Sequence, residues 1–518
     1  MRFVSMIAIL GVVLMTASVA SQVCVAELKL DRIEGTEPLN VVFILSDDHR
    51  YDVMGFLGHP WVETPAMDAM ARDGVYFENA MVTTSLCSPS RASILTGQYM
   101  HNHGVVDNNV PTPPGTIFFP QYLQAAGYRT SYFGKWHMGG NSDEPRPGFD
   151  KWVSFKGQGH YYPPANLKNW SLNVDGESVP QQGYITDELT DYAIDWLNSS
   201  VKDSGKPFFM YLSHKGVHGM FHPAERHAGR YKDKPLPVPQ TMADTAENYT
   251  DKPLWLKNQR NSWHGVDFAY HQDTDIAEHY RLYCEALLSV DESIARVRKW
   301  LDDNDLADNT LVMYMGDNGF QWGEHGLIDK RTAYEASMRV PLLGVCPKLW
   351  KPQTTLQQVV ANIDIGPTVL EAAGLKTPEQ MDGQSFIQLA GGRMKPSEWR
   401  QNLLYEYYWE YNFPHTPTIF ALRTQQYKFI QYHGIWDIDE LYDLKNDPHE
   451  EHNLIFDEEH QPRITEMRSD LHQILADADA NRVPFSHKRG MGSNLRLRSG
   501  SQPADFPPQW MRDKNAQE

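Results

Sequence analysis

Two pairs of oxygen-bearing side chains each follow an apolar run of the chain. Asp47 and Asp48 come after residues 41–45 (VVFIL), and Asp317 and Asn318 come shortly after the run that ends at position 315. Such runs are typical of strands buried in a parallel sheet, and these sheets bind ligands beyond the carboxyl ends of their strands. Three carboxylates and one carboxamide predict a Ca²⁺ or Mg²⁺ site rather than a Zn²⁺ site. Either pair alone would more simply cap a turn or helix, but together they favour a metal.

Cys87 opens a second candidate site, the polar segment CSPSRASILTG. Ser88 and Pro89 are typical of a helix start, and Gly97 is typical of a helix end. We therefore expect Cys87 just before a helix N-terminus, where backbone N–H groups favour an anion, with Arg91 about one turn further on. A lone cysteine is more often a buried apolar residue, but its polar neighbours favour a chemical role. The chain has no Cys-x-x-Cys pair that would indicate a thiol redox protein.

The segment from Cys87 to Gly97 resembles the signature of type I sulfatases, Cys-x-Pro-x-Arg with Leu-Thr-Gly downstream. The resemblance covers nearly the whole mature chain, because further family motifs occur in order. They are Asp47-Asp48, Gly134-Lys135-Trp136-His137, His218, Asp317-Asn318-Gly319, and Lys330 followed by Tyr334-Glu335 and Arg339-Val340-Pro341.

This resemblance implies a modified nucleophile and a metal ion. In the family, a formylglycine-generating enzyme oxidises the cysteine to formylglycine, and the hydrated aldehyde attacks sulfur. A Ca²⁺ ion would be held by the side chains at Asp47, Asp48, Cys87, Asp317 and Asn318.

The resemblance also implies roles for the remaining polar residues. Arg91 and Lys135 would hold the diol and the sulfate group. His218 or Lys330 would protonate the leaving oxygen. His137 would take the proton whose loss expels sulfate.

One departure concerns the catalytic histidine. The family often has His-x-Pro here, whereas this chain has His218-Gly219-Met220, with His222-Pro223 slightly later. We expect His218 to be the catalytic residue and His214 to contact the sugar or support the structure.

The substrate expectation also rests on resemblance. Ser85-Leu86-Cys87, residues 99–106 and Asp329-Lys330-Arg331 look most like the N-acetylglucosamine-6-sulfatase branch, which includes extracellular heparan 6-O-sulfatases. A sulfated carbohydrate is therefore the expected substrate, with Arg331 as a further sugar contact. Several aromatic and polar side chains are candidates to line the sugar subsites, with core packing as the alternative for the aromatic ones. These are Trp136, His160, Tyr161, Trp409 and His415.

Two other functions stay open at this point. A phosphonate monoester or phosphodiester hydrolase would share the nucleophile and the metal set. A non-catalytic glycan-binding protein could be built on the same scaffold, although every expected catalytic residue is present. Comparing turnover of sulfate and phosphate esters separates the first alternative, and binding without turnover would favour the second.

The elements that must position these residues alternate along the chain. Strands are expected at 41–45, 128–133, 207–213 and 310–315, with helices near 64–73, 185–197 and 280–302. This alternation predicts an α/β domain with a large, mostly parallel sheet flanked by helices. The resemblance to sulfatases implies an alkaline-phosphatase-like form of this fold. Short strands without crossover helices then predict a smaller antiparallel sheet, at 403–411, 419–423, 428–432 and 440–442, closed by a helix near 462–476.

The predicted organisation begins with a signal peptide. Residues 1–26 have a positive start, an apolar stretch and small residues suited to cleavage after Ala20 or Ala26. The catalytic domain is expected over 27–394, the antiparallel subdomain over 395–485 and an irregular tail over 486–518. Secretion or export to the periplasm would leave three cysteines, Cys87, Cys284 and Cys346, so at least one is free or modified.

Charge and hydropathy exclude two kinds of partner. The formal net charge of −19 argues against nucleic acid, which needs stripes of Lys and Arg. No segment after the signal is long and apolar enough to cross a membrane, so no stable membrane association is expected. Because sulfate esters are also anions, a local basic pocket must overcome the global charge.

Overall fold

The computed structural model describes residues 28–139, 142–167, 169–202, 204–242, 245–259, 265, 275–480 and 483. The predicted signal peptide and irregular tail lie outside the described residues. Among the helices that are described, none combines the length and the apolar character needed to span a bilayer.

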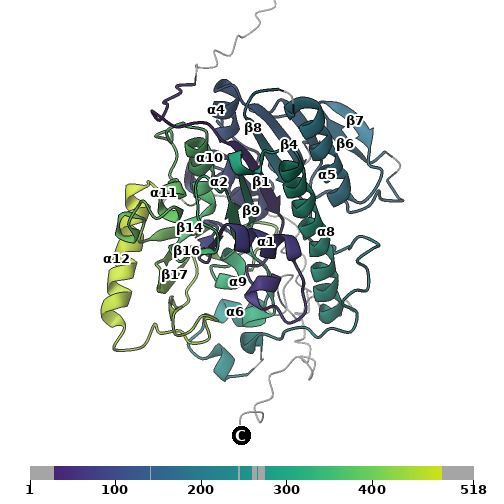
Figure 1. The fold of residues 1–518 in the computed structure, drawn as a ribbon. Helices are drawn as coiled ribbons and strands as arrows, with labels where there is room; N and C mark the ends of the chain where they lie inside the picture. The colour runs from purple at the N-terminus through teal and green to yellow at the C-terminus, as the bar shows by residue number, and fades with distance from the viewer. Residues whose placement is uncertain are drawn as a thin grey trace, which may run out of the picture.

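A ten-stranded sheet forms the centre of the molecule, with strand order β13-β2-β12-β9-β1-β8-β4-β5-β6-β7 (Figure 1). The run β9-β1-β8-β4-β5 is parallel throughout, whereas β12 is antiparallel to both neighbours and β6 and β7 form an antiparallel edge. The strands are β1 (Asn40–Ser46), β2 (Val75–Phe77), β4 (Arg129–Lys135), β5 (Lys151–Phe155), β6 (Ser171–Val174), β7 (Glu177–Pro180), β8 (Phe208–Ser213), β9 (Thr310–Gly316), β12 (Leu342–Val345) and β13 (Thr354–Leu356).

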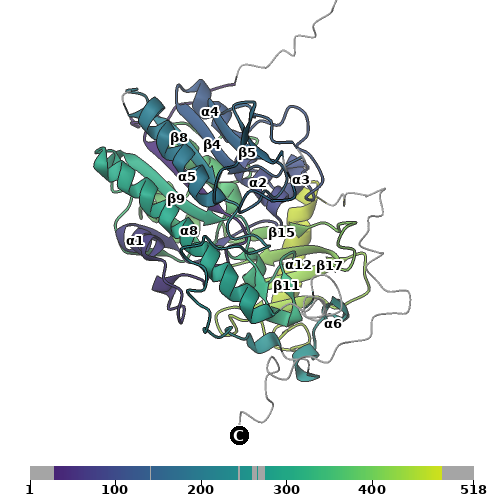
Figure 2. The same ribbon diagram turned by 90° about the vertical axis from the view of Figure 1, so that its right-hand side faces the viewer.

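Alternate side chains of the central strand enter two separate hydrophobic cores. Val41, Phe43 and Leu45 of β1 pack on the face covered by α2, α4 and α10, whereas Val42 and Ile44 pack on the face covered by α1, α5 and α8. This follows from the period of two in a strand, and burial on both faces explains the continuous apolar run. Figure 2 shows α5 and α8 lying along the sheet. The predicted α/β class is confirmed.

The helices lie close to their predicted positions. The 28-residue α8 is capped by Asp275, whose side chain accepts from two backbone N–H groups. The described α-helices are α1 (Pro65–Asp73), α2 (Cys87–Thr96), α3 (Met100–His103), α4 (Phe119–Ala125), α5 (Ile185–Trp196), α6 (Leu254–Gln259), α8 (Ile276–Asp303), α9 (Glu335–Met338), α10 (Ile365–Ala372), α11 (Ile387–Ala390) and α12 (Gln461–Asp477). Two further pairs of short strands complete the described strands. β10 (Gln321–Trp322) pairs antiparallel with β11 (Ile328–Asp329), and β3 (Ala80–Met81) pairs parallel with β14 (Val360–Ala361).

A second sheet of four antiparallel strands follows, as the sequence predicts. It comprises β15 (Leu403–Tyr407), β16 (Thr418–Arg423), β17 (Tyr427–His433) and β18 (Glu440–Asp443), and α12 covers it at the edge of the molecule (Figure 1). The first strand ends at Tyr407, earlier than expected, and residues 408–417 form a loop. The subdomain boundaries themselves remain predictions.

Buried ion pairs join this smaller sheet to the main body. Glu335 of α9 lies 3.0 Å from Arg423 Nε and 2.9 Å from Lys428 Nζ, and Lys428 also lies 2.7 Å from Glu450. All four side chains are at most 6% exposed. Burial disfavours the charged Glu335, but Arg423 and Lys428 hold its pKa well below the ordinary value. Glu335 is therefore expected to be ionised at neutral pH.

Replacing Glu335 should destabilise the protein strongly. Glu335→Ala leaves two buried cations facing a single carboxylate, an imbalance that costs about 3–5 kcal/mol. Urea unfolding would measure this loss, with the exposed Glu458→Ala as the matched control. A loss no larger than that of the control would show that the ion pairs do not hold the two sheets together.

Candidate functional site

The two predicted metal-binding pairs meet at one edge of the sheet. Strands β1 and β9 are parallel neighbours, with Ser46 opposite Gly316, so the residues that follow them emerge side by side. The Asp48 backbone N–H donates to Asp317 Oδ1 over 3.0 Å, and Asn318 Nδ2 donates to Asp48 Oδ1 over 2.6 Å. Asp47, Asp48 and Asp317 each offer an oxygen within 4.8 Å of the others. The structure therefore brings together the residues predicted from their positions after strands.

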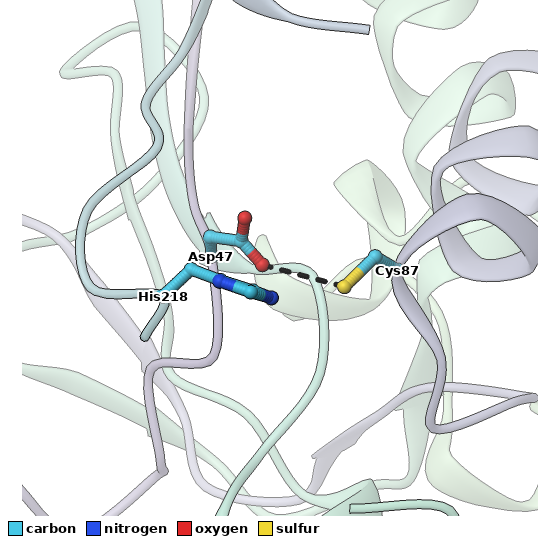
Figure 3. Close-up of side chains that lie close together, drawn as sticks. All are labelled: Asp47, Cys87 and His218. Atoms are coloured by element: carbon cyan, nitrogen blue, oxygen red, sulfur yellow. Dashed lines mark hydrogen bonds between the residues drawn. The ribbon is translucent and has the colours of Figure 1, made fainter. Parts of the chain in front are cut away.

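Cys87 lies at the same edge, delivered by the start of α2. Its Sγ donates to Asp47 Oδ1 over 3.5 Å, and the two side chains point toward one another beside His218 (Figure 3). Gly97 ends the helix in the left-handed region at φ 68°, as predicted.

The predicted helix start was wrong by two residues. Cys87 is the first residue of the helix, and the extended Leu86 takes the cap position without a side-chain hydrogen bond. The Ser88 N–H is satisfied instead by Asn108 Oδ1 at 3.0 Å. A distant acceptor thus replaces the local cap that the sequence indicated.

Three cations neutralise the carboxylates. Arg91 lies 2.9 Å (Nε) and 2.8 Å (Nη2) from Asp317 Oδ2, Lys135 is paired with Asp47, and Lys330 is paired with Asp48 and lies 3.0 Å from Cys87 Sγ. All of these side chains are almost completely buried. Pairing is what makes so many buried charges tolerable.

Burial and the neighbouring charges together lower the pKa of Asp47 but raise the pKa values of Asp317 and Cys87. Burial alone would raise the pKa of Asp47, but the cations around it, Lys135 first, hold it well below the ordinary value. Burial and then Asp47 raise the pKa of Asp317 to about 7. Burial and then Asp47 also raise the pKa of Cys87 to about 12. Without a bound cation, the encoded thiol therefore stays protonated at neutral pH.

Two predicted histidines border the cluster. His137 lies 3.3 Å (Nδ1) from Ser88 Oγ and 3.0 Å (Nε2) from Gln158 Nε2. His218 Nε2 lies 3.9 Å from Asp48 Oδ2, and its Nδ1 is bonded to the Gly219 carbonyl. Burial, followed by the field of Lys135, lowers the pKa of both rings well below the ordinary value. Both are neutral in the ligand-free protein, and a bound anion would raise their pKa values.

The two predicted sugar contacts lie outside the cluster. His214 is fully buried, and its Nε2 lies 3.0 Å from Ser293 Oγ of α8, on the opposite face of the sheet from Arg91. The preceding residue, Ser213, accepts a hydrogen bond from Arg91. Because side chains alternate along a strand, Ser213 and His214 point to opposite faces of the sheet. Arg331 pairs with Asp329 at 2.6 Å and Glu410 at 2.7 Å. Sugar contacts by His214 and Arg331 remain predictions.

Sequence reasoning missed several supporting residues. Ser213 and the Lys135 carbonyl accept from Arg91 Nη1 at 2.7 Å, and Gln158 contacts His137. These single polar residues had no spacing signal of their own.

Trp136 and Tyr161, two of the suggested subsite aromatics, are buried among other rings, which favours the packing alternative for their faces. The three cysteines among the described residues are buried and free, so Cys284 and Cys346 do not pair with each other.

The residues fit a calcium ion. Three carboxylates converge, and Asn318 Oδ1 is buried without a hydrogen-bond partner among the described groups. A buried carbonyl oxygen with no donor is costly, and a hard cation would satisfy it.

Comparison with known proteins decides the family. The family model described as "Sulfatase" matches residues 39–375, which include every residue of the cluster. The chain belongs to the sulfatase family. A second model, "N-sulphoglucosamine sulphohydrolase, C-terminal", matches residues 323–477 and so includes the four-stranded sheet. Sulfatases are sulfuric ester hydrolases, and the catalytic residues predicted from the family motifs all lie within the first match.

Individual relatives of this sulfatase agree. It is 33% identical to an N-acetylglucosamine-6-O-sulfatase of Bacteroides thetaiotaomicron, over 84% of this chain and 86% of that protein. A solved enzyme in complex with its substrate D-glucosamine-2-N,6-O-disulfate is 30% identical, with a TM-score of 0.77 over 86% of this chain and 99% of the other. The phosphonate monoester hydrolase of Agrobacterium radiobacter, 21% identical with a TM-score of 0.69 over 85% of this chain and 96% of that one, shares the fold.

Calcium should stabilise the protein through this cluster. At about 100 times the dissociation constant, a ligand that binds only the folded state adds about 2.7 kcal/mol. We expect Ca²⁺ to raise Tm and a chelator to lower it, with Asp317→Asn losing most of the response. Differential scanning calorimetry with and without Ca²⁺ tests this, with the exposed Asp302→Asn as control. An equal response in Asp317→Asn and wild type would contradict the site.

Proposed function

We propose that this sulfatase removes sulfate from a sulfated sugar, using formylglycine at position 87 and a calcium ion. The observation that carries the proposal is the convergence of Cys87 with Asp47 and Lys330 in one buried cluster.

Relatives support the substrate class. Both an N-acetylglucosamine-6-O-sulfatase and a structure holding a glucosamine disulfate match more than four-fifths of this chain. We propose a 6-sulfated glucosamine unit of a polysaccharide or its fragments as the substrate. We further propose maturation by a formylglycine-generating enzyme, and export through the signal peptide at 1–26 to the periplasm or the medium.

The bound groups would supply the reactive oxygen and positive charge. A hydrated aldehyde at position 87 would supply a hydroxyl that can attack sulfur and a second one whose deprotonation releases sulfate. Ca²⁺ held by Asp47, Asp48, Asp317, Asn318 and the side chain at position 87 would neutralise anionic oxygens. Overall, the S–O bond to the sugar breaks, water supplies the new oxygen, and the products are the free alcohol and sulfate.

The chain's own residues orient the groups and move the protons. Arg91 is paired with Asp317, and Lys135 is paired with Asp47. These ion pairs hold both carboxylates in their orientation within the cluster. Lys330, 3.0 Å from the Cys87 sulfur, is placed to contact the oxygens at position 87. His218 lies on the open side of the cluster at 21% side-chain exposure, where the sugar oxygen would leave. Once a bound sulfate group raises its pKa, the ring carries a proton on Nε2 as well as on Nδ1 and can donate the Nε2 proton to that oxygen. We assign the acceptance of the second proton to His137, which borders the cluster beside Ser88.

The first experiment is the mass of the peptide that contains position 87, from protein secreted by its native host. We expect formylglycine, turnover of glucosamine 6-sulfate above that of the matching phosphate ester, and a folded but inactive Cys87→Ser variant. Unmodified Cys87 in a host that matures other sulfatases would contradict the proposal, as would equal activity of Cys87→Ser. Faster turnover of the phosphate or phosphonate ester would favour the hydrolase alternative.

Replacement of His218 should affect chemistry more than binding. His218→Gln removes the proton donor, and a general acid contributes about 10²–10⁴-fold. We expect kcat to fall by about that factor on a sugar sulfate, with a much smaller loss on an ester whose leaving group is a good one, such as an aryl sulfate. His222→Gln, four residues away, serves as control. Equal losses on both esters would assign His218 to another role.

A further inference from the structure

Lys215 is a buried cation that the proposed mechanism does not use. It lies in the loop after β8, and only 3% of the residue is exposed. Its Nζ lies 4.8 Å from the centre of the Tyr161 ring. Within the described parts of the chain, no carboxylate forms an ion pair with it. Lys135 and Lys330, by contrast, are each paired with an aspartate.

Lys215 lies in a loop that backbone hydrogen bonds hold against the reacting centre, since the Asp47 N–H donates to the Gly216 carbonyl over 2.8 Å and the Val217 N–H donates to the Asp47 carbonyl over 2.7 Å. Besides burial, the groups that act on it most strongly are Lys135, Asp47, Asp48 and Cys87. Tyr161, whose ring it faces, donates its hydroxyl to the His218 carbonyl over 2.9 Å. The same tyrosine therefore holds both Lys215 and the loop that carries His218. Burial, then Lys135, lowers the pKa of Lys215 to about 8, so its charge is retained at neutral pH.

The local charge balance indicates what Lys215 attracts. The formal charges of Asp47, Asp48 and Asp317 are matched by those of Lys135, Lys330 and Arg91. Lys215, like the proposed Ca²⁺, then adds positive charge beyond these matched pairs, in a chain of net charge −19. A buried, unpaired ammonium is unfavourable unless a ligand compensates it. A ligand of opposite charge enters this site in the form of the sulfate group.

We propose that Lys215 binds an oxygen of the sulfate group that is cleaved. This inference rests on the proposed function, because it assigns a further substrate contact to the same site. The alternative ligand for Lys215 is a second anionic substituent on the sugar, which would offer the same negatively charged oxygens. The scissile group is favoured because the loop that carries Lys215 is hydrogen-bonded to the Asp47 backbone, beside the reacting atoms, and the ring that Lys215 faces is hydrogen-bonded to the His218 carbonyl.

The test compares Lys215→Met and Lys215→Arg with the exposed control Lys232→Met. The kcat/KM is measured on glucosamine 6-sulfate and on glucosamine 2-N,6-O-disulfate, and the affinity for inorganic sulfate is measured by calorimetry. We expect Lys215→Met to lose about ten- to hundredfold in kcat/KM on both sugars and to bind inorganic sulfate more weakly. Lys215→Arg should recover part of both losses.

Stability separates a substrate contact from a structural role. Lys215→Met removes an unpaired buried charge, so Tm without ligand should stay the same or rise, and the formylglycine content should not change. Unchanged sulfate affinity, or a loss confined to the disulfated sugar, would overturn the inference. The sulfate-binding measurement needs no turnover. If the wild type hydrolyses no sulfate ester, the proposed function fails, and weaker sulfate binding by Lys215→Met alone would still support the Lys215 contact.

Discussion

The neutralisation of buried carboxylates by buried cations is the constraint on which the rest of the site depends. Three aspartates cannot share a dry sheet edge unless positive charge lies beside them. Arg91 comes from α2, Lys135 from the end of β4 and Lys330 from the segment after β11. Each cation therefore ties a different element to the edge formed by β1 and β9. The arrangement explains why residues far apart in sequence must fold together before any of them is stable.

The main sheet places these groups, and the small sheet encloses them. The parallel register of β1 and β9 sets the aspartates side by side, and the adjacent β8 and β4 supply the histidine loop and Lys135. The loop between β15 and β16 reaches back through Glu410 to hold Arg331, the neighbour of Lys330. The smaller sheet thus reaches the site through this ion pair and through β15, where the Tyr405 hydroxyl accepts from the Ser85 N–H over 3.4 Å. Glu335 and its partners anchor the sheet to the body.

The sequence predicts features that follow from a repeated pattern of residues. It does not predict features that depend on one contact with a residue far along the chain. Apolar runs followed by polar pairs predicted both the sheet and the meeting of Asp48 with Asp317, because a parallel strand end is a fixed place. The start of α2 was displaced because Asn108, twenty residues away, satisfies the Ser88 N–H instead of a local cap. His214 and Ser213 are adjacent in sequence, yet they face opposite sides of the sheet. A role for Lys215 could not be predicted, because a single lysine in a polar loop belongs to no motif or repeated spacing.

The complete burial of Cys87 also bears on the order of events in the life of the chain. Its side chain has no accessible surface, and α2 is wedged between the sheet edge and the residues around Asn362. An enzyme that oxidises this side chain must bind the flanking peptide as well, and in the folded protein that peptide is the buried first turn of α2. The proposed maturation must therefore act on the extended chain, before β1 and β9 come together. Modification and folding would compete in time, and a chain that folded first would be permanently excluded from maturation.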